Sequence, residues 1–81
     1  MVVLYPNPAH NFLTMMISTR QREKIQYSIV DATGRVVKTG TQNLQSGSNR
    51  VSVSVNELSS GVYTMVLEGD NGRTQHTFVK K

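Results

Sequence analysis

The chain has 81 residues, of which 37% are hydrophobic, and its nine Lys and Arg against five Asp and Glu give a net charge of +4. This length predicts one small domain, residues 1–81, or a fragment of a longer protein. The absence of cysteine excludes disulfides, thiol catalysis and cysteine-ligated metal sites. No apolar run approaches the ~18 residues of a transmembrane helix, so the chain is not expected to span a membrane as a helix.

Most of the chain alternates apolar and polar residues, which is the period of a half-buried β-strand. The clearest example is Val51-Ser52-Val53-Ser54-Val55, and Ile25-Gln26-Tyr27-Ser28-Ile29 repeats it. In chain order, this alternation, short apolar or β-branched runs and turn signals predict about seven short strands, at residues 2–5, 12–17, 25–29, 35–39, 51–55, 62–68 and 73–79. Short strands at spacings of about 8–12 residues are typical of all-β sandwiches, so we expect an immunoglobulin-like antiparallel β-sandwich with Greek-key or meander connections.

Turn sequences separate these strands. Asp31-Ala32-Thr33-Gly34 predicts a hairpin turn in which Gly34 takes a positive φ. Gly69-Asp70-Asn71-Gly72 predicts a second hairpin between the last two strands. The stretch 55–60 could form a single helical turn capped by Asn56, too short to be a helix of consequence.

The first strand ends at Tyr5-Pro6-Asn7-Pro8. Two prolines remove two donors from a sheet ladder, so we expect residues 2–5 to form an edge strand that leaves through a rigid turn. Near the other end of the chain, Tyr63 stands at the head of a late strand, directly after a tight corner. In immunoglobulin-like sandwiches a tyrosine in this place buries its ring and turns its hydroxyl back to a nearby backbone group. An ordinary core aromatic is the alternative for Tyr63.

The residues predict no catalytic site, no metal site and no cofactor, and we expect this domain not to be an enzyme. The two histidines, His10 and His76, lie far apart in sequence, and the five carboxylates fall at turns and strand ends without an acid–base motif. The positive charges are scattered apart from Arg20, Arg22 and Lys24, so nucleic-acid binding is not expected either. The remaining functions for such a domain are binding a partner or serving as a targeting signal.

Four motifs in order give the chain a family resemblance: Leu4-Tyr5-Pro6-Asn7-Pro8-Ala9, Ile29-Val30-Asp31 with Gly34-Arg35-Val36-Val37, Leu58-Ser59-Ser60-Gly61-Val62-Tyr63, and Phe78-Val79-Lys80-Lys81. Over nearly its whole length the chain resembles the C-terminal sorting domain of type IX secretion substrates in Gram-negative Bacteroidota. The resemblance implies an immunoglobulin-like sandwich, in agreement with the strand pattern.

The resemblance also implies a function. The domain would direct a cargo through the periplasm and across the outer membrane to the cell surface or the medium. Its partners would be the translocon and outer-membrane shuttle or sortase components. A sortase-like peptidase would cut before the domain and join the cargo to anionic lipopolysaccharide.

The recognition residues that the resemblance assigns fall into two sets. The opening motif contributes Tyr5, Pro6, Asn7 and Pro8. The remaining residues are Gly34, Arg35, Gly61, Tyr63, Phe78, Val79, Lys80 and Lys81. We expect Gly34 and Gly61 to act through backbone conformation alone. We expect Lys80 and Lys81 to be direct contacts, because folding should have little need of them.

Two other interpretations stay open. One is an immunoglobulin-like adhesion or carbohydrate-binding module, although such modules often present exposed Trp or Tyr platforms and this chain has no Trp. The other is self-association through open edge strands.

Overall fold

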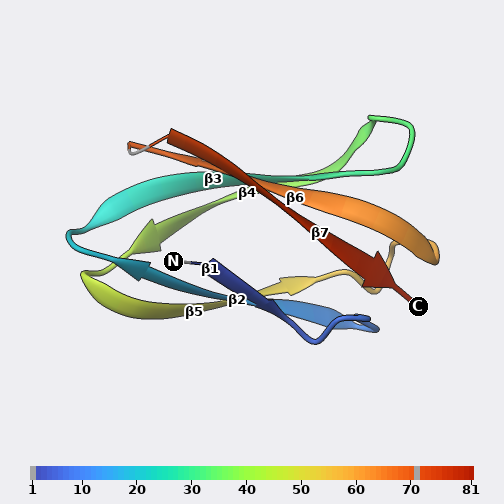
Figure 1. The fold of residues 1–81 in the computed structure, drawn as a ribbon, viewed down its shortest axis with the longest axis horizontal. Helices are drawn as coiled ribbons and strands as arrows, with labels where there is room; N and C mark the ends of the chain where they lie inside the picture. Colours follow the sequence, from blue (N-terminus) through green and yellow to red (C-terminus); the bar gives the residue numbers. More distant parts are fainter. Residues whose placement is uncertain (1, 71) are drawn as a thin grey trace.

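Seven β-strands form the fold in a computed structural model of the chain, which describes residues 2–70 and 72–81 (Figure 1). All seven predicted strands are present, and the first has the predicted bounds. In chain order the strands are β1 (Val2–Tyr5), β2 (Phe12–Thr19), β3 (Glu23–Val30), β4 (Val36–Leu44), β5 (Gly47–Ser54), β6 (Gly61–Gly69) and β7 (Gly72–Lys80).

The strands form two antiparallel sheets that pack face to face. One sheet has the order β1-β2-β5 and the other has the order β4-β3-β6-β7. The predicted β-sandwich is therefore confirmed. The pairs β2–β5 and β3–β6 join strands that are not consecutive in sequence, so the connections are of the Greek-key kind rather than a simple meander. At the open sides of the sandwich, β1 lies across from β7, as Figure 1 shows.

The core lies between the sheets and is built from the alternate residues that the sequence pattern places on one face. Each large apolar side chain buried here contributes roughly 1.5–3 kcal/mol relative to an exposed one. The largest fully buried side chains are Phe78, Leu13, Met15, Ile29, Leu44, Met65, Val53 and Val55.

Two strands are much longer than the sequence predicts. β4 continues to Leu44 and β5 begins at Gly47, in a region where polar residues replace the apolar alternation. These segments are strands because β3 and β2 pair with them along their length. Gly40 pairs with Tyr27 across the β3–β4 ladder, and a side chain at Gly40 would meet the Tyr27 ring.

The stretch 55–60 forms a single turn at the predicted place, but this turn is not assigned as helix. The Leu58 backbone N–H donates to the Val55 carbonyl at 3.0 Å, and the structure assigns no helix within the described residues. Between β6 and β7, Gly69 pairs with Gly72, as the predicted second hairpin requires, while Asn71 of that turn lies outside the described residues.

The predicted hairpin turn at Asp31 is confirmed, and Gly34 has a φ of 90°. Gly61, in contrast, does not have a positive φ, and a Cβ there would meet only the Tyr63 ring, at 3.9 Å. The expectation that conformation alone requires glycine therefore holds for Gly34 and is wrong for Gly61.

We expect Gly34→Ala to lower the free energy of unfolding by about 1–2 kcal/mol, because an L-residue is strained at this φ. Gly61→Ala is the matched control and should change it by less than about 0.5 kcal/mol. Urea denaturation of the two variants beside the wild type measures both values. Equal losses in the two variants would contradict this account of the turn.

Candidate functional site

The motif residues gather at one end of the sandwich, although they come from four separate parts of the chain. The molecule is 35 Å long, and Figure 1 shows the loop after β1, the β3–β4 turn, the turn before β6 and the end of β7 at the same end of the long axis. We call this region the motif end and define it as residues 5–9, 31–38, 55–63 and 78–81.

The opening motif is joined to the end of β7 by three hydrogen bonds. The Val79 N–H donates to the Asn7 side-chain oxygen at 3.0 Å. The Ala9 N–H donates to the Val79 carbonyl at 2.8 Å, and the Lys81 N–H donates to the Ala9 carbonyl at 2.9 Å. Ala9 is completely buried and forms a parallel bridge with Lys80. We call this contact the terminal latch, made by residues 7–9 and 79–81.

The prolines of the opening motif occupy positions that suit them. Pro6 and Pro8 are exposed, outside β1 and outside the hydrogen bonds of the terminal latch. The peptide bonds Tyr5–Pro6 and Asn7–Pro8 are both cis. The predicted edge strand that leaves through a proline turn is confirmed, since β2 is the one strand that pairs with β1 among the described residues.

Tyr63 has the geometry that the sequence predicts for a tyrosine corner. Its ring is buried and its hydroxyl donates to the Ser59 carbonyl at 2.6 Å. The ring also stacks on Phe78, its partner across the β6–β7 ladder, with the centroids 5.7 Å apart. The alternative of an ordinary core aromatic is thereby set aside, because the hydroxyl closes the corner before β6.

The expectation that folding has little need of Lys80 is wrong, because this residue is buried. Its side chain lies on the same face of β7 as Phe78, only 8% of the residue is exposed, and its ammonium donates to the Lys81 carbonyl at 3.1 Å. Lysine can bury its aliphatic stem in this way while its charged head reaches the surface. Lys81 is exposed, as expected. The two terminal lysines therefore differ in how a partner could reach them.

The β3–β4 turn is organised by the Asp31 carboxylate. One oxygen accepts from the Thr33 hydroxyl at 2.6 Å and from the backbone N–H groups of Thr33 and Arg35, each at 3.0 Å. The other lies 3.4 Å from Nε of Arg35. These hydrogen bonds, led by that of the Thr33 hydroxyl, hold the pKa of Asp31 below its ordinary value. The Arg35 side chain remains 78% exposed.

The β3–β4 hairpin is tied to the turn before β6 by an ion pair. The Lys38 ammonium lies 3.0 Å from the Glu57 carboxylate, and this hydrogen bond holds the pKa of Glu57 below its ordinary value. An open hollow of about 550 Å³ lies between the two turns, with Arg35, Glu57 and Tyr63 among its lining residues. The hairpin and the tyrosine corner therefore form one continuous surface.

An exposed apolar patch at this end was not predicted from the sequence. Val36 pairs with Val30, and Val62 pairs with Val79, on the outer face of the four-stranded sheet. Val36 is 53% exposed and Val62 is 52% exposed. We call these four residues the valine patch. A signal for it exists in the sequence, because Val62 precedes the inward Tyr63 and so must point outward.

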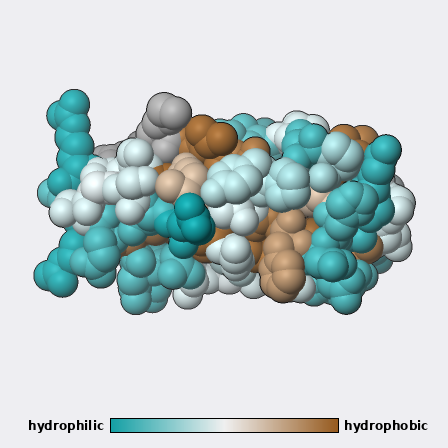
Figure 2. Space-filling view, turned by 90° about the horizontal axis from the view of Figure 1, so that it is seen from below, coloured by the Kyte–Doolittle hydropathy of each residue, from teal (hydrophilic) through white to brown (hydrophobic). Residues whose placement is uncertain are grey.

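The outer face of the other sheet has exposed apolar side chains of its own. Val3, Tyr5 and Phe12 are 42%, 40% and 57% exposed. Figure 2 looks onto this face and shows brown surface interrupted by teal side chains. The two outer faces therefore allow matched comparisons between exposed valines at and away from the motif end.

Neither a metal-binding group nor a membrane-spanning helix is found among the described residues. No group of three or more His, Asp or Glu converges within residues 2–70 and 72–81, and the structure assigns no helix there that could cross a membrane. The motif end instead combines buried residues, such as Tyr63 and Phe78, with exposed ones, such as Arg35 and Val62.

Comparison with known proteins identifies the family. A family model described as a secretion system C-terminal sorting domain matches residues 3–81. The chain belongs to this family, and it is a type IX secretion C-terminal sorting signal. Such a signal takes its cargo through the periplasm to the cell surface or outside. No curated protein and no solved structure matches the chain.

We expect Tyr63→Phe to lower the free energy of unfolding by about 1 kcal/mol, because the Ser59 carbonyl loses its donor. The ring and its stacking on Phe78 are kept. Tyr27→Phe is the matched control, since no hydrogen bond of the Tyr27 hydroxyl is found among the described residues, and it should have little effect. Thermal or urea denaturation measures both variants. An unchanged free energy of unfolding in the Tyr63→Phe variant would contradict the role of the hydroxyl.

We expect Asn7→Ala to cost about 1 kcal/mol of unfolding free energy, because the Val79 N–H loses its acceptor. Asn7→Asp keeps an oxygen at this position and should lose less. Denaturation of both variants in parallel gives the difference. If the two substitutions cost the same, the side-chain oxygen is not what stabilises the terminal latch.

Proposed function

We propose that the type IX machinery recognises the motif end of the folded domain. The observation that carries this proposal is the Asn7–Val79 hydrogen bond, which joins residues 72 positions apart. Because of this bond, the opening motif and the closing motif belong to one structure. A partner could then read both motifs together only while the domain is folded.

The motif residues divide into a frame and a contact surface. Tyr63, Phe78 and Lys80 are buried, so they would act by holding the fold. Arg35 and Lys81 are exposed beside the valine patch and would contact the partner directly. An apolar centre flanked by cations is a common composition for a protein–protein interface.

We propose further that a sortase-like cysteine peptidase removes the domain after translocation and that the cargo is joined to anionic lipopolysaccharide. The cargo that the resemblance favours is an arginine-specific gingipain, a secreted cysteine protease of Bacteroidota. Val2 lies toward the end of the sandwich opposite the motif end, where it lines a second hollow. A cargo joined before Val2 would therefore leave the motif end accessible.

Glycan binding is the second candidate, and one observation favours it. Tyr5 and Phe12 expose aromatic rings on the outer face of the β1-β2-β5 sheet. Sugar rings pack on such faces. Titration of the domain with anionic lipopolysaccharide, using Phe12→Ala as the variant, would separate this candidate from recognition by the secretion machinery.

The proposed function is tested with a periplasmic reporter fused to residues 1–81, expressed in a type IX-competent strain and in one that lacks the translocon. We expect delivery to the surface or the medium only in the competent strain. The double variant Val36→Ser, Val62→Ser should reduce delivery by about tenfold or more, since loss of central apolar contacts typically costs over 1 kcal/mol each. Val3→Ser is the matched control and should deliver as the wild type does.

Two results would contradict the proposal. Retention of the intact, folded fusion in the periplasm of both strains would mean that the domain does not direct export in this setting. Equal delivery by the patch variant and the Val3→Ser control, with both folded, would mean that recognition lies elsewhere.

A further inference from the structure

The outer edge of β7 is covered at one end and open along the rest. The Val79 N–H and C=O and the Lys81 N–H point away from β6, because they bond to residues 7–9. The β6–β7 register has no shift, and backbone groups alternate sides along a strand. The N–H and C=O groups of Arg73, Gln75 and Thr77 therefore point to the same open side. Within residues 2–70 and 72–81 these groups have no partner.

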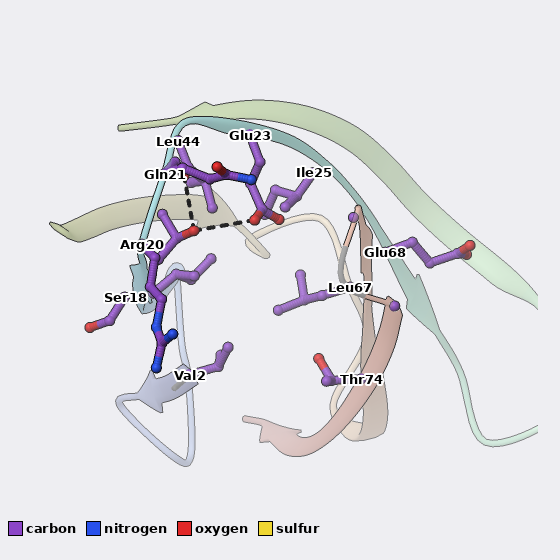
Figure 3. A pocket seen from close by; sticks show the side chains of 14 residues that line it. Val2, Ser18, Arg20, Gln21, Glu23, Ile25, Leu44, Leu67, Glu68 and Thr74 are labelled. Carbon is purple, nitrogen blue, oxygen red and sulfur yellow. Dashed lines mark hydrogen bonds between the residues drawn. The ribbon is translucent and has the colours of Figure 1, made fainter. Parts of the chain in front are cut away.

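An open hollow lies directly inside this free edge. Its volume is about 410 Å³, and Val2 of β1 and Thr74 of β7 line opposite sides of its opening. Figure 3 shows Val2 and Thr74 across the opening from each other, with Leu67 and Ile25 pointing into the space behind them. Leu67 and Ile25 are 6% and 5% exposed, so the floor of the hollow belongs to the core. We call Arg73–Thr77 and this hollow the open edge.

The rim of the hollow is held in place by hydrogen bonds of its own. The Thr19 hydroxyl lies 3.0 Å from the Gln21 carbonyl and 3.2 Å from the Glu23 carboxylate (Figure 3). Arg20 also lines the hollow. These hydrogen bonds fix the conformation of the β2–β3 turn, which forms this part of the rim.

On the side of the sandwich between β1 and β7, the β7 edge is covered at the motif end and left uncovered by the described residues at the opposite end. At the motif end, residues 7–9 cross from β1 to β7, pair with its edge and bury Ala9 completely. At the other end no segment of the described chain does this. In the terminal latch the β7 edge accepts backbone hydrogen bonds from another segment through the isolated bridge at Ala9, and the open edge has the same outward backbone groups together with an apolar floor.

We propose that the open edge binds an extended segment of a secretion-machinery protein by strand addition. The segment would pair its backbone with Arg73, Gln75 and Thr77, and its alternate side chains would be apolar and enter the hollow. Such β-augmentation takes its affinity from main-chain hydrogen bonds and its specificity from pockets for alternate side chains. This inference deepens the proposed function and rests on it.

A second copy of this chain fits the open edge less well. The matching edge of another β7 would bring Thr74 and His76 over the hollow, because these residues occupy the inward positions of the strand. Both side chains are polar, whereas the floor is apolar. The occupant is therefore assigned to a partner with an apolar alternation rather than to a β7–β7 dimer.

The test is amide hydrogen exchange of the domain with outer-membrane vesicles from a type IX-competent strain. Vesicles from an isogenic strain without the translocon are the control. Strand addition predicts that exchange slows by about tenfold or more at Arg73, Gln75 and Thr77 with competent vesicles only. Exchange at Thr74 and His76 should change little, since these amides already pair with β6.

Two pairs of variants test the same edge through vesicle binding and reporter delivery. Gln75→Pro removes an outward N–H and should weaken both by about tenfold, whereas Gln75→Ala keeps the N–H and should not. Thr74→Lys places a charge at the lip of the hollow and should also weaken binding, whereas Thr74→Val should not. The Thr74 pair keeps the test decisive if Gln75→Pro fails to fold.

The outcomes separate this inference from the proposed function. If the wild-type domain neither binds competent vesicles nor directs delivery, the proposed function is wrong, and so is the proposed binding of a secretion-machinery protein at the open edge. If it does both but the three amides exchange as in the free domain, only strand addition at the open edge is overturned. Protection that appears without vesicles and grows with domain concentration would overturn the partner in favour of a second copy.

Discussion

The terminal latch is the contact on which the arrangement of this small sandwich depends. Three hydrogen bonds connect residues 7–9 to residues 79–81, and they close the side of the sandwich between β1 and β7 at one end. Bringing together two segments so distant in sequence costs loop-closure entropy. Burial of Ala9 and Phe78 helps to offset this cost. The motif end exists as one surface because this contact holds its first and last segments together.

The family motifs in this chain serve two physical purposes. Some residues make the frame, as when the Tyr63 hydroxyl closes the corner at Ser59 and the Asp31 carboxylate closes the hairpin turn. Others, such as Arg35 and Val62, are exposed on that frame and stay available to a partner. The proposed recognition of the motif end depends on both, because a surface that a partner binds has to be presented in one conformation.

Much of the fold follows from local patterns that the sequence displays openly. Apolar alternation, short apolar runs and turn sequences together identify all seven strands, and the tight corner before Tyr63 indicates the hydrogen bond of its hydroxyl. The end of β4 and the start of β5 could not be predicted in the same way, since residues 40–43 and 47–50 lack apolar alternation and form strands because β3 and β2 pair with them.

The candidate site was harder to predict, because it depends on contacts between distant segments. Which strand Asn7 would meet is decided by the crossing of the chain from one sheet to the other. The burial of Lys80 depends on its phase along β7, which places it on the face of Phe78, and composition suggests a surface lysine instead. The valine patch, in contrast, could be found by asking which apolar residues fall on the outward phase of their strands.

The most direct test of this account is amide hydrogen exchange in the isolated domain, read residue by residue by NMR. We expect slow exchange at Ala9 and Val79, which donate in the terminal latch, and fast exchange at Gln75 and Thr77, which lie on the same edge without a partner among the described residues. Fast exchange at Ala9 and Val79 in the folded domain would show that the two motifs are not joined, and would contradict the central claim.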